Sequence, residues 1–143
     1  MKKPLLLIAV GAISLLTLLL AGCSKKDSGG SYSMKSVAGA YKLTASTVTS
    51  GGITVDYMPY LDDCEKDDLL TLNADSTYVY TDAGTTCTPD GSTSGQWYIS
   101  GSYLIQDGDT VNIKSFNGTA LVLTFTGSSG GVTGTSTTTL TKQ

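Results

Sequence analysis

The sequence predicts an all-β protein, an antiparallel up-and-down barrel of about eight or nine strands. Short runs of β-branched and aromatic residues recur along the chain, separated by Gly, Asn and Asp turn signals. Apolar and polar residues alternate within several of these runs, and no segment after residue 23 has a capped helical period. A closed barrel is favoured over a flat sheet because closure removes exposed strand edges. The length of 143 residues is typical of one domain.

Each predicted strand is bounded by a turn signal. Ser50-Gly51-Gly52 ends the first strand, and Pro59 follows the second. The later turns lie at residues 74–76, at Gly101, and at residues 107–109, 117–118 and 127–131. The predicted strands span residues 41–49, 53–57, 69–73, 77–82, 96–100, 102–106, 110–114, 119–126 and 132–141.

Alternation predicts which side chains share a face. Leu121, Leu123 and Phe125 are two residues apart and should lie on one face of their strand. Trp97 and Ile99 should likewise lie opposite their polar neighbours. These apolar faces are the expected lining of the barrel.

The N-terminus has the layout of a secretory signal peptide, with Lys2 and Lys3 before the apolar run 5–20. The alternative is a transmembrane helix, which needs about 20 apolar residues. Leu20-Ala21-Gly22-Cys23 resembles the lipobox of bacterial lipoproteins, in which the cysteine is diacylated at sulfur and becomes the new N-terminus. The resemblance implies a cleaved signal peptide (residues 1–22), a lipidated flexible tether (23–36) and a folded domain (37–143).

The same resemblance implies a location in the cell envelope. Lipid on Cys23 would hold the protein on a membrane, because acyl chains together give stable attachment. Ser24 is not the aspartate that favours inner-membrane retention in enterobacterial lipoproteins, so the outer membrane is expected. The choice between its periplasmic and surface faces stays open.

With Cys23 lipidated, Cys64 and Cys87 remain as an even pair. In an oxidising compartment such a pair is expected to form a disulfide. A metal or redox site is the alternative, but the chain has no CxxC motif and no histidine.

Composition argues against catalysis and against nucleic acid. The chain has no histidine and no arginine, so it lacks the commonest general base and the bidentate phosphate clamp. Its formal net charge of −3 becomes −5 once residues 1–22, with two lysines and no acid, are removed. The acidic run 62–68 lacks the spacing of a calcium loop and is expected to be a solvated loop. We therefore expect no enzyme, no cofactor and no metal. The one catalytic alternative is a pair of carboxylates of the kind that glycosidases use.

Several short motifs resemble those of lipocalin-like proteins. The segment from Gly39 to Leu43 resembles their G-x-W-x-L opening strand, with Tyr41 in place of tryptophan. Cys64-Glu65-Lys66-Asp67-Asp68, a hairpin at 73–78, Cys87 and Gly95-Gln96-Trp97 then follow. This order resembles the small lipocalin-like lipoproteins of the Bacteroidetes, whose hairpin usually has glycine where Ser76 stands. The resemblance covers residues 37–141 and implies a lipid-tethered, eight-stranded barrel.

Aromatic residues suggest a binding site inside such a barrel. Tyrosines there can line an amphipathic pocket and orient a ligand through their hydroxyl groups. The alternative is that they fill the interior completely, since a barrel of eight strands is only just wide enough for side chains or one small ligand. An enclosed cavity above about 300 Å³ would favour binding. The candidate ligand-binding residues are Tyr41, Tyr78, Tyr80, Trp97 and Phe125.

The sequence thus predicts a monomeric, non-catalytic protein that binds a small apolar or amphipathic ligand. The competing hypothesis is a structural or interaction protein with a filled barrel, whose loops engage protein or glycan. Residues 57–61 form an apolar stretch that could cap the barrel or meet a partner.

Asp75-Ser76-Thr77 and Asp109-Thr110-Val111 resemble an O-glycosylation acceptor of the Bacteroidetes, which makes Ser76 and Thr110 candidate glycosylation sites.

Overall fold

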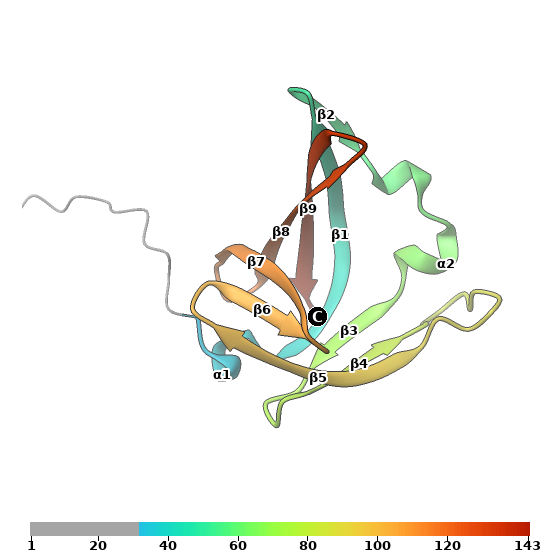
Figure 1. Ribbon diagram of the computed structural model, residues 1–143. Coiled ribbons are helices and arrows are strands. Elements are labelled where there is room, and N and C mark those ends of the chain that lie inside the picture. The colour runs from blue at the N-terminus through green and yellow to red at the C-terminus, as the bar shows by residue number, and fades with distance from the viewer. Residues whose placement is uncertain (1–31) are drawn as a thin grey trace, which may run out of the picture.

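Nine antiparallel strands make up most of residues 32–143, the part of the chain that the computed structural model describes (Figure 1). The expected signal peptide, Cys23 and most of the expected tether lie outside the described residues. Three one-turn helices are present: α1 (Met34–Val37), η1 (Met58–Tyr60) and α2 (Asp63–Lys66). The strands are β1 (Gly39–Ser50), β2 (Ile53–Asp56), β3 (Leu69–Leu72), β4 (Thr77–Thr81), β5 (Thr93–Ser100), β6 (Tyr103–Gln106), β7 (Asp109–Phe116), β8 (Ala120–Ser129) and β9 (Val132–Lys142).

Strand β1 closes the barrel. Strands β3 to β9 pair with one another in sequence order, and β1 pairs with both β9 and β3. This makes an eight-stranded antiparallel barrel with β2 as one extra strand, which pairs only with the second half of β1. The prediction of an all-β up-and-down barrel is confirmed.

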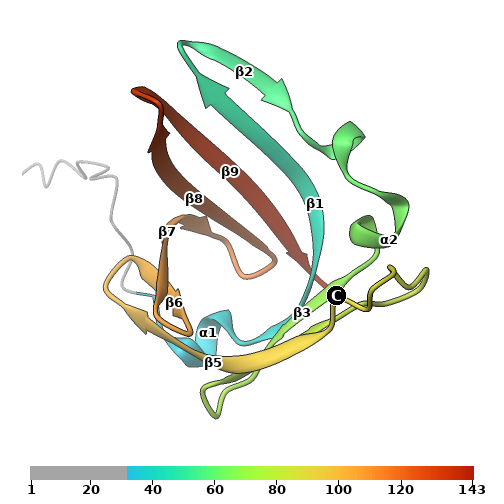
Figure 2. The same cartoon turned by 45° about the vertical axis from the view of Figure 1, so that its right-hand side comes forward.

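Four strands continue beyond the closed barrel. β1 leaves β3 after Lys42 and pairs with β2 from Thr47 onward, while β8 and β9 stay paired along their whole length. Figures 1 and 2 show β2, β1, β9 and β8 projecting together away from β3–β7. We call the projecting part the extended sheet: residues 46–50, 53–56, 125–129 and 132–136.

A β-bulge decides which side chains of β1 face inward. The register with β9 shifts between Leu43 and Ala45, so one extra residue is inserted there. Without this bulge, simple alternation from Leu43 would put Val48 on the outer face. Val48 instead lies opposite Ser136, on the same face of β9 as Leu140. The inner face of the barrel therefore continues smoothly onto the extended sheet.

The core fills the closed end of the barrel. Its fully buried side chains are Val37, Tyr41, Leu72, Trp97, Leu104 and Leu121. Trp97 Nε1 donates a hydrogen bond to the Asn73 carbonyl oxygen at 2.8 Å, and the Tyr41 hydroxyl donates to the Val37 carbonyl oxygen. These bonds give the buried polar atoms of both rings a partner, which burial requires.

Helix α1 belongs to the domain and not to a tether. Ser33 and Ser36 form a reciprocal capping box, and Val37 is fully buried in the core. Tyr32 and Met34 pack against the same core. The expectation that residues 32–36 belong to a flexible tether is therefore wrong, because a capped turn with apolar contacts covers this end of the barrel.

The turn between β6 and β7 also ties three strands together. The Asp107 carboxylate accepts hydrogen bonds from the Tyr78 hydroxyl at 2.7 Å and from the Gln96 backbone N–H at 2.8 Å. A Cβ on Gly95 would lie 2.2 Å from Asp107 Oδ2. Glycine is therefore required two residues before Trp97, because any side chain there would displace this carboxylate.

Within residues 32–143, no helix has the length and apolar character needed to cross a bilayer.

Candidate functional site

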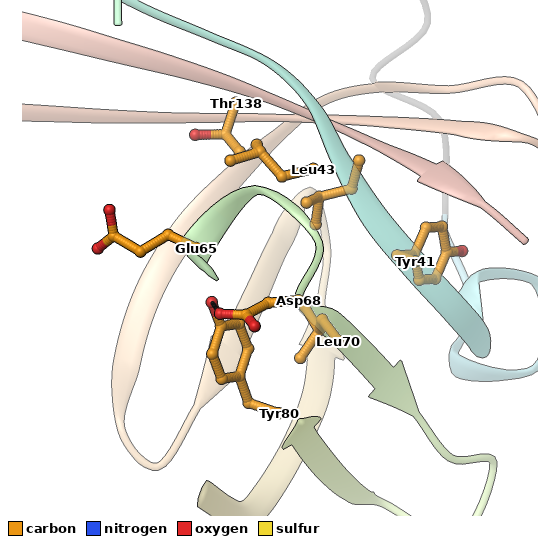
Figure 3. Close-up of a pocket in the computed structure, with 8 residues that line it drawn as sticks. Tyr41, Leu43, Glu65, Asp68, Leu70, Tyr80 and Thr138 are labelled. Atoms are coloured by element: carbon orange, nitrogen blue, oxygen red, sulfur yellow. Dashed lines mark hydrogen bonds between the residues drawn. The ribbon is translucent and has the colours of Figure 1, made fainter. Parts of the chain in front are cut away.

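A small pocket opens where the closed barrel passes into the extended sheet. Its volume is about 190 Å³. Five elements or their flanks contribute to it: β1, α2, the start of β3, β4 and β9. The lining residues are Tyr41, Leu43, Glu65, Asp68, Leu70, Tyr80, Thr138 and Leu140 (Figure 3).

Cross-strand pairing builds the apolar wall of the pocket. Leu70 lies opposite Tyr41 on one side and opposite Tyr80 on the other. Leu43 lies opposite Leu140 in the same way. Because directly opposed residues in antiparallel strands point to the same face, these five side chains converge on the barrel interior.

Asp68 and Tyr80 form the polar part of the pocket. The Tyr80 hydroxyl donates to Asp68 Oδ2 at 2.7 Å, as Figure 3 shows, and the Ala83 backbone N–H donates to Oδ1 at 3.1 Å. Asp68 is only 7% exposed. Burial, aided by the bond to Asp68, raises the pKa of Tyr80 well above its ordinary value of 10, so this phenol remains a neutral donor.

Tyr41 presents its ring to the pocket and its hydroxyl to the core. Burial raises the pKa of Tyr41 to about 12. On its ring lies Lys142, whose Nζ is 5.5 Å from the ring centroid. Lys142 also lies over Phe116, toward the closed end of the barrel, and it does not line the pocket. The cation–π contact therefore belongs to the core.

Helix α2 carries Glu65 to the edge of the pocket. Asp62 and Glu65 form a capping box, in which the Asp62 backbone N–H donates to Glu65 Oε2 at 2.8 Å. Cys64 forms a disulfide with Cys87, with a Cα–Cα distance of 5.3 Å. The predicted disulfide is confirmed, and it ties α2 to the loop between β4 and β5.

That loop is organised by aspartates. Asp82 accepts hydrogen bonds from the backbone N–H groups of Cys87 and Gly91, and Asp67 accepts one from Thr85. The expectation that the acidic run 62–68 is a solvated loop holds for three of its five acids, Asp62, Asp63 and Glu65, which are exposed. Part of it forms α2, and its last member, Asp68, is buried at the pocket.

The structure brings together two of the five candidate ligand-binding residues. Tyr41 and Tyr80 line the pocket, whereas Tyr78 and Trp97 are buried in the core. Phe125 is 55% exposed, so the expectation that it lines a closed interior is wrong. It does lie on the inner face, but one residue beyond Thr124, the last residue of β8 that pairs with β7.

Two functional candidates, Glu65 and Asp68, were missed by sequence reasoning. Their signal was the C-E-K-D-D segment immediately before an apolar strand, which places the last acid beside a buried edge.

The comparisons with known proteins agree with this architecture. The model of a protein family described as a lipocalin-like domain matches residues 37–123. This chain belongs to the lipocalin-like domain family. The searches of curated proteins and of solved structures gave no match. Lipocalin-like domains are in general binding folds rather than enzymes.

Little of this lipocalin-like barrel is hollow at its closed end. The pocket of about 190 Å³ is smaller than the roughly 300 Å³ at which drug-sized ligand sites begin.

Outside the barrel, the 57–61 stretch forms η1, and Tyr57 and Tyr60 are both exposed. Within residues 32–143, no group of three or more Cys, Asp and Glu side chains is placed to hold a metal ion.

The two candidate glycosylation sites differ in exposure. Thr110 is exposed at the start of β7, and Ser76 is half-buried in the turn before β4. Modification at either residue stays a prediction.

Proposed function

We propose that this lipocalin-like protein binds a small apolar or amphipathic ligand without catalysis, in the pocket between β1, β3, β4 and β9. The observation that carries the proposal is the pairing of an apolar wall with one buried polar group, Asp68 with Tyr80. Binding sites typically combine a mostly apolar lining with a few placed polar groups that fix orientation. Leucines supply the first component, and the Asp68–Tyr80 pair supplies the second.

Retention of a ligand by the protein from its own host tests this proposal. Native mass spectrometry of the full mature chain should show an added mass that denaturation releases. Thr138→Phe places a ring in the pocket and should lower the retained fraction. Thr139→Phe, the next residue on the opposite face of β9, is the matched control and should leave it unchanged. An unliganded wild-type chain, or equal retention by both variants, would contradict the proposal.

We further propose that Cys23 anchors the protein to the outer membrane through lipid. The support is the lipobox-like segment 20–23 after a charged and an apolar region. Cys23→Ser should move the protein from the membrane fraction to the soluble fraction, whereas Ser24→Ala should leave it in the membrane. Membrane association that survives Cys23→Ser would refute lipid anchoring at this residue.

A second candidate function is that of a structural or interaction protein. The filled closed end of the barrel favours it, because Trp97, Tyr41 and Leu104 are fully buried there. Under this hypothesis the Thr138→Phe variant keeps all partner binding, and chemical cross-linking in cells captures a macromolecule through the exposed Tyr57 or Tyr60. Loss of a retained small molecule in Thr138→Phe would favour the first function.

A further inference from the structure

We propose that the ligand is a cationic amphiphile whose positive head lies beside Asp68 and Glu65. Its alkyl body would leave the pocket along the inner face of the extended sheet. The inference rests on the proposed binding function and specifies the chemical class of the ligand.

The charges around the pocket determine the sign of the head. Asp68 and Glu65 are the charged groups that line it, and no lysine lines it. Lys66 is paired with Asp63 at 2.8 Å, and Lys142 lies over the Tyr41 and Phe116 rings. A carboxylate head would therefore meet two like charges without a partner cation, which is costly in a half-buried site.

Asp68 has acceptor capacity left for such a head. Each of its oxygens accepts one hydrogen bond, from Tyr80 and from Ala83. A carboxylate offers about four lone-pair positions, so an ammonium group can still be accepted. Glu65 is exposed at the edge of the pocket and would approach the same head from α2.

The alkyl path follows from the strand register. Thr138, a pocket residue, lies opposite both Ser46 and Leu123. The next inward row across the four strands consists of Phe125, Ser136, Val48 and Val55, and the row after it of Gly127, Gly134, Ser50 and Ile53. Successive inward rows are about 7 Å apart along a strand. The apolar face therefore begins one row beyond the pocket.

Small residues hollow out the middle of this face. The hollow has a volume of about 430 Å³ and is lined by Val48, Ser50, Gly127, Ser128, Ser129, Val132 and Gly134. Phe125, Ile53 and Val55 border it and are all exposed. Asp56, the acid of β2, pairs with Thr47 on the outer face, so no charged side chain points into the path. An alkyl chain that leaves the pocket at Thr138 would reach this uncharged hollow at Val48, in the next inward row.

Three probes with the same dodecyl chain test the sign of the head. We would titrate dodecylamine, dodecanol and dodecanoate, below their micelle concentrations, into the full mature chain carrying Cys23→Ser to remove the lipid. Calorimetry should show dodecylamine binding at least about tenfold tighter than dodecanoate, with dodecanol between them. Equal affinities, or a preference for dodecanoate, would overturn the inference while leaving the binding function intact. Failure of all three probes to bind would overturn this ligand class, and ligand retention by the protein from its own host would then decide the binding function separately.

Variants separate the head site from the alkyl path. Glu65→Gln and Asp68→Asn should each reduce the preference for dodecylamine over dodecanol, whereas Asp109→Asn, on exposed β7, should not. Phe125→Ser and Val48→Ser should weaken the binding of dodecylamine severalfold but leave the binding of butylamine unchanged. Val79→Ser, on the outer face of β4, is their control and should change neither affinity. If Glu65→Gln preserves the full preference while Asp68→Asn unfolds, the cationic head site is wrong. If Phe125→Ser and Val48→Ser leave dodecylamine binding unchanged, the alkyl path is wrong.

Discussion

Ser76 occupies a backbone conformation that suits glycine. Its φ angle is 75°, in the left-handed region, within the turn between β3 and β4. A side chain in this region costs about 1 kcal/mol or more, because Cβ approaches the following carbonyl oxygen. The Ser76 carbonyl oxygen also accepts the Trp97 backbone N–H at 2.8 Å, so the turn must hold this shape. The backbone at position 76 thus favours glycine for a physical reason.

Ser76→Gly should stabilise the domain. We expect the free energy of unfolding to rise by about 0.5–1 kcal/mol, because relief of the left-handed strain exceeds the added entropy of the unfolded chain. Urea denaturation followed by Trp97 fluorescence would measure this change. Ala74→Gly, in the same turn but without a positive φ, is the control and should bring no gain. A loss of stability in Ser76→Gly would show that the serine hydroxyl matters more than the backbone.

The hydrogen bonds that Asp107 accepts from Gln96 and Tyr78 make stability depend on pH. Hydrogen bonds from the Gln96 N–H and the Tyr78 hydroxyl hold the pKa of Asp107 below its ordinary value of 3.8. The unfolded chain therefore binds a proton here before the folded chain does, so stability from this group is present above pH 3.8 and is lost as pH falls below it. Asp107→Asn should flatten the acid limb of the stability curve, as measured by denaturation at a series of pH values. An unchanged acid limb would contradict this linkage.

At the scale of elements, α2 depends on bonds to other parts of the chain. A four-residue helix is too short to be stable alone, because nucleation of the first turn is unfavourable. The Asp62–Glu65 capping box and the Cys64–Cys87 disulfide hold it in place. The edge of the pocket therefore rests on a cross-link between two loops.

Removal of the disulfide should affect both stability and binding. In the double variant Cys64→Ser/Cys87→Ser we expect the unfolding free energy to fall by about 3 kcal/mol, because the disulfide no longer restricts the unfolded chain between cysteines 23 residues apart. We also expect dodecylamine to bind more weakly. Thermal denaturation and calorimetry would measure the two effects. Reductant should reproduce them in the wild-type chain and do nothing to the double variant. Unchanged binding in a folded double variant would mean that α2 is positioned without the cross-link.

The outward face of the long strand β9 is lined by threonines. Threonines occupy its outward positions 133, 135, 137, 139 and 141. Several pair across strands, as in Thr126 with Thr135 at 2.9 Å and Thr44 with Thr141 at 2.8 Å. Threonine combines a β-branched side chain, which favours strands, with a hydroxyl that faces water. The outward positions of β9 are thus polar without charge, whereas its inward positions combine Val132 and Leu140 with Gly134, Ser136 and Thr138.

For the whole molecule, stability should be distributed unevenly. Every core side chain lies in the closed barrel or in α1, and none lies within residues 46–56 or 125–136. The extended sheet has strand hydrogen bonds but exposed apolar side chains, so it should open locally at a lower free energy than the barrel.

Hydrogen exchange tests this gradient. Amides of residues 46–56 and 125–136 should exchange at least about tenfold faster than those of β3 and the buried parts of β5 and β6. Dodecylamine should slow exchange in the extended sheet if its alkyl chain lies there. Uniform protection over both regions would show that the extended sheet is stabilised by contacts other than core packing.

The strands, the disulfide pair and the fold class could be predicted from the sequence because their signals are local. Alternation placed Tyr78 with Tyr80, and Trp97 with Ile99, on inner faces, and glycine, asparagine and aspartate marked the turns. The composition alone shows that arginine and histidine are absent, so the chain lacks the commonest general base and the bidentate phosphate clamp. These properties need only neighbouring residues or a count, so no tertiary information was required.

Only the tertiary structure decided where the site lies and what it contains. The bulge between Leu43 and Ala45 turns Val48 inward, and the early end of the β1–β3 pairing leaves Phe125 exposed. The hydrogen bond between Asp68 and Tyr80 joins the residue just before β3 to β4. Such features depend on register between distant segments, and one inserted residue reverses every side chain beyond it. That is why the sequence could predict a barrel, whereas the pocket and its charge emerged only from the closed fold.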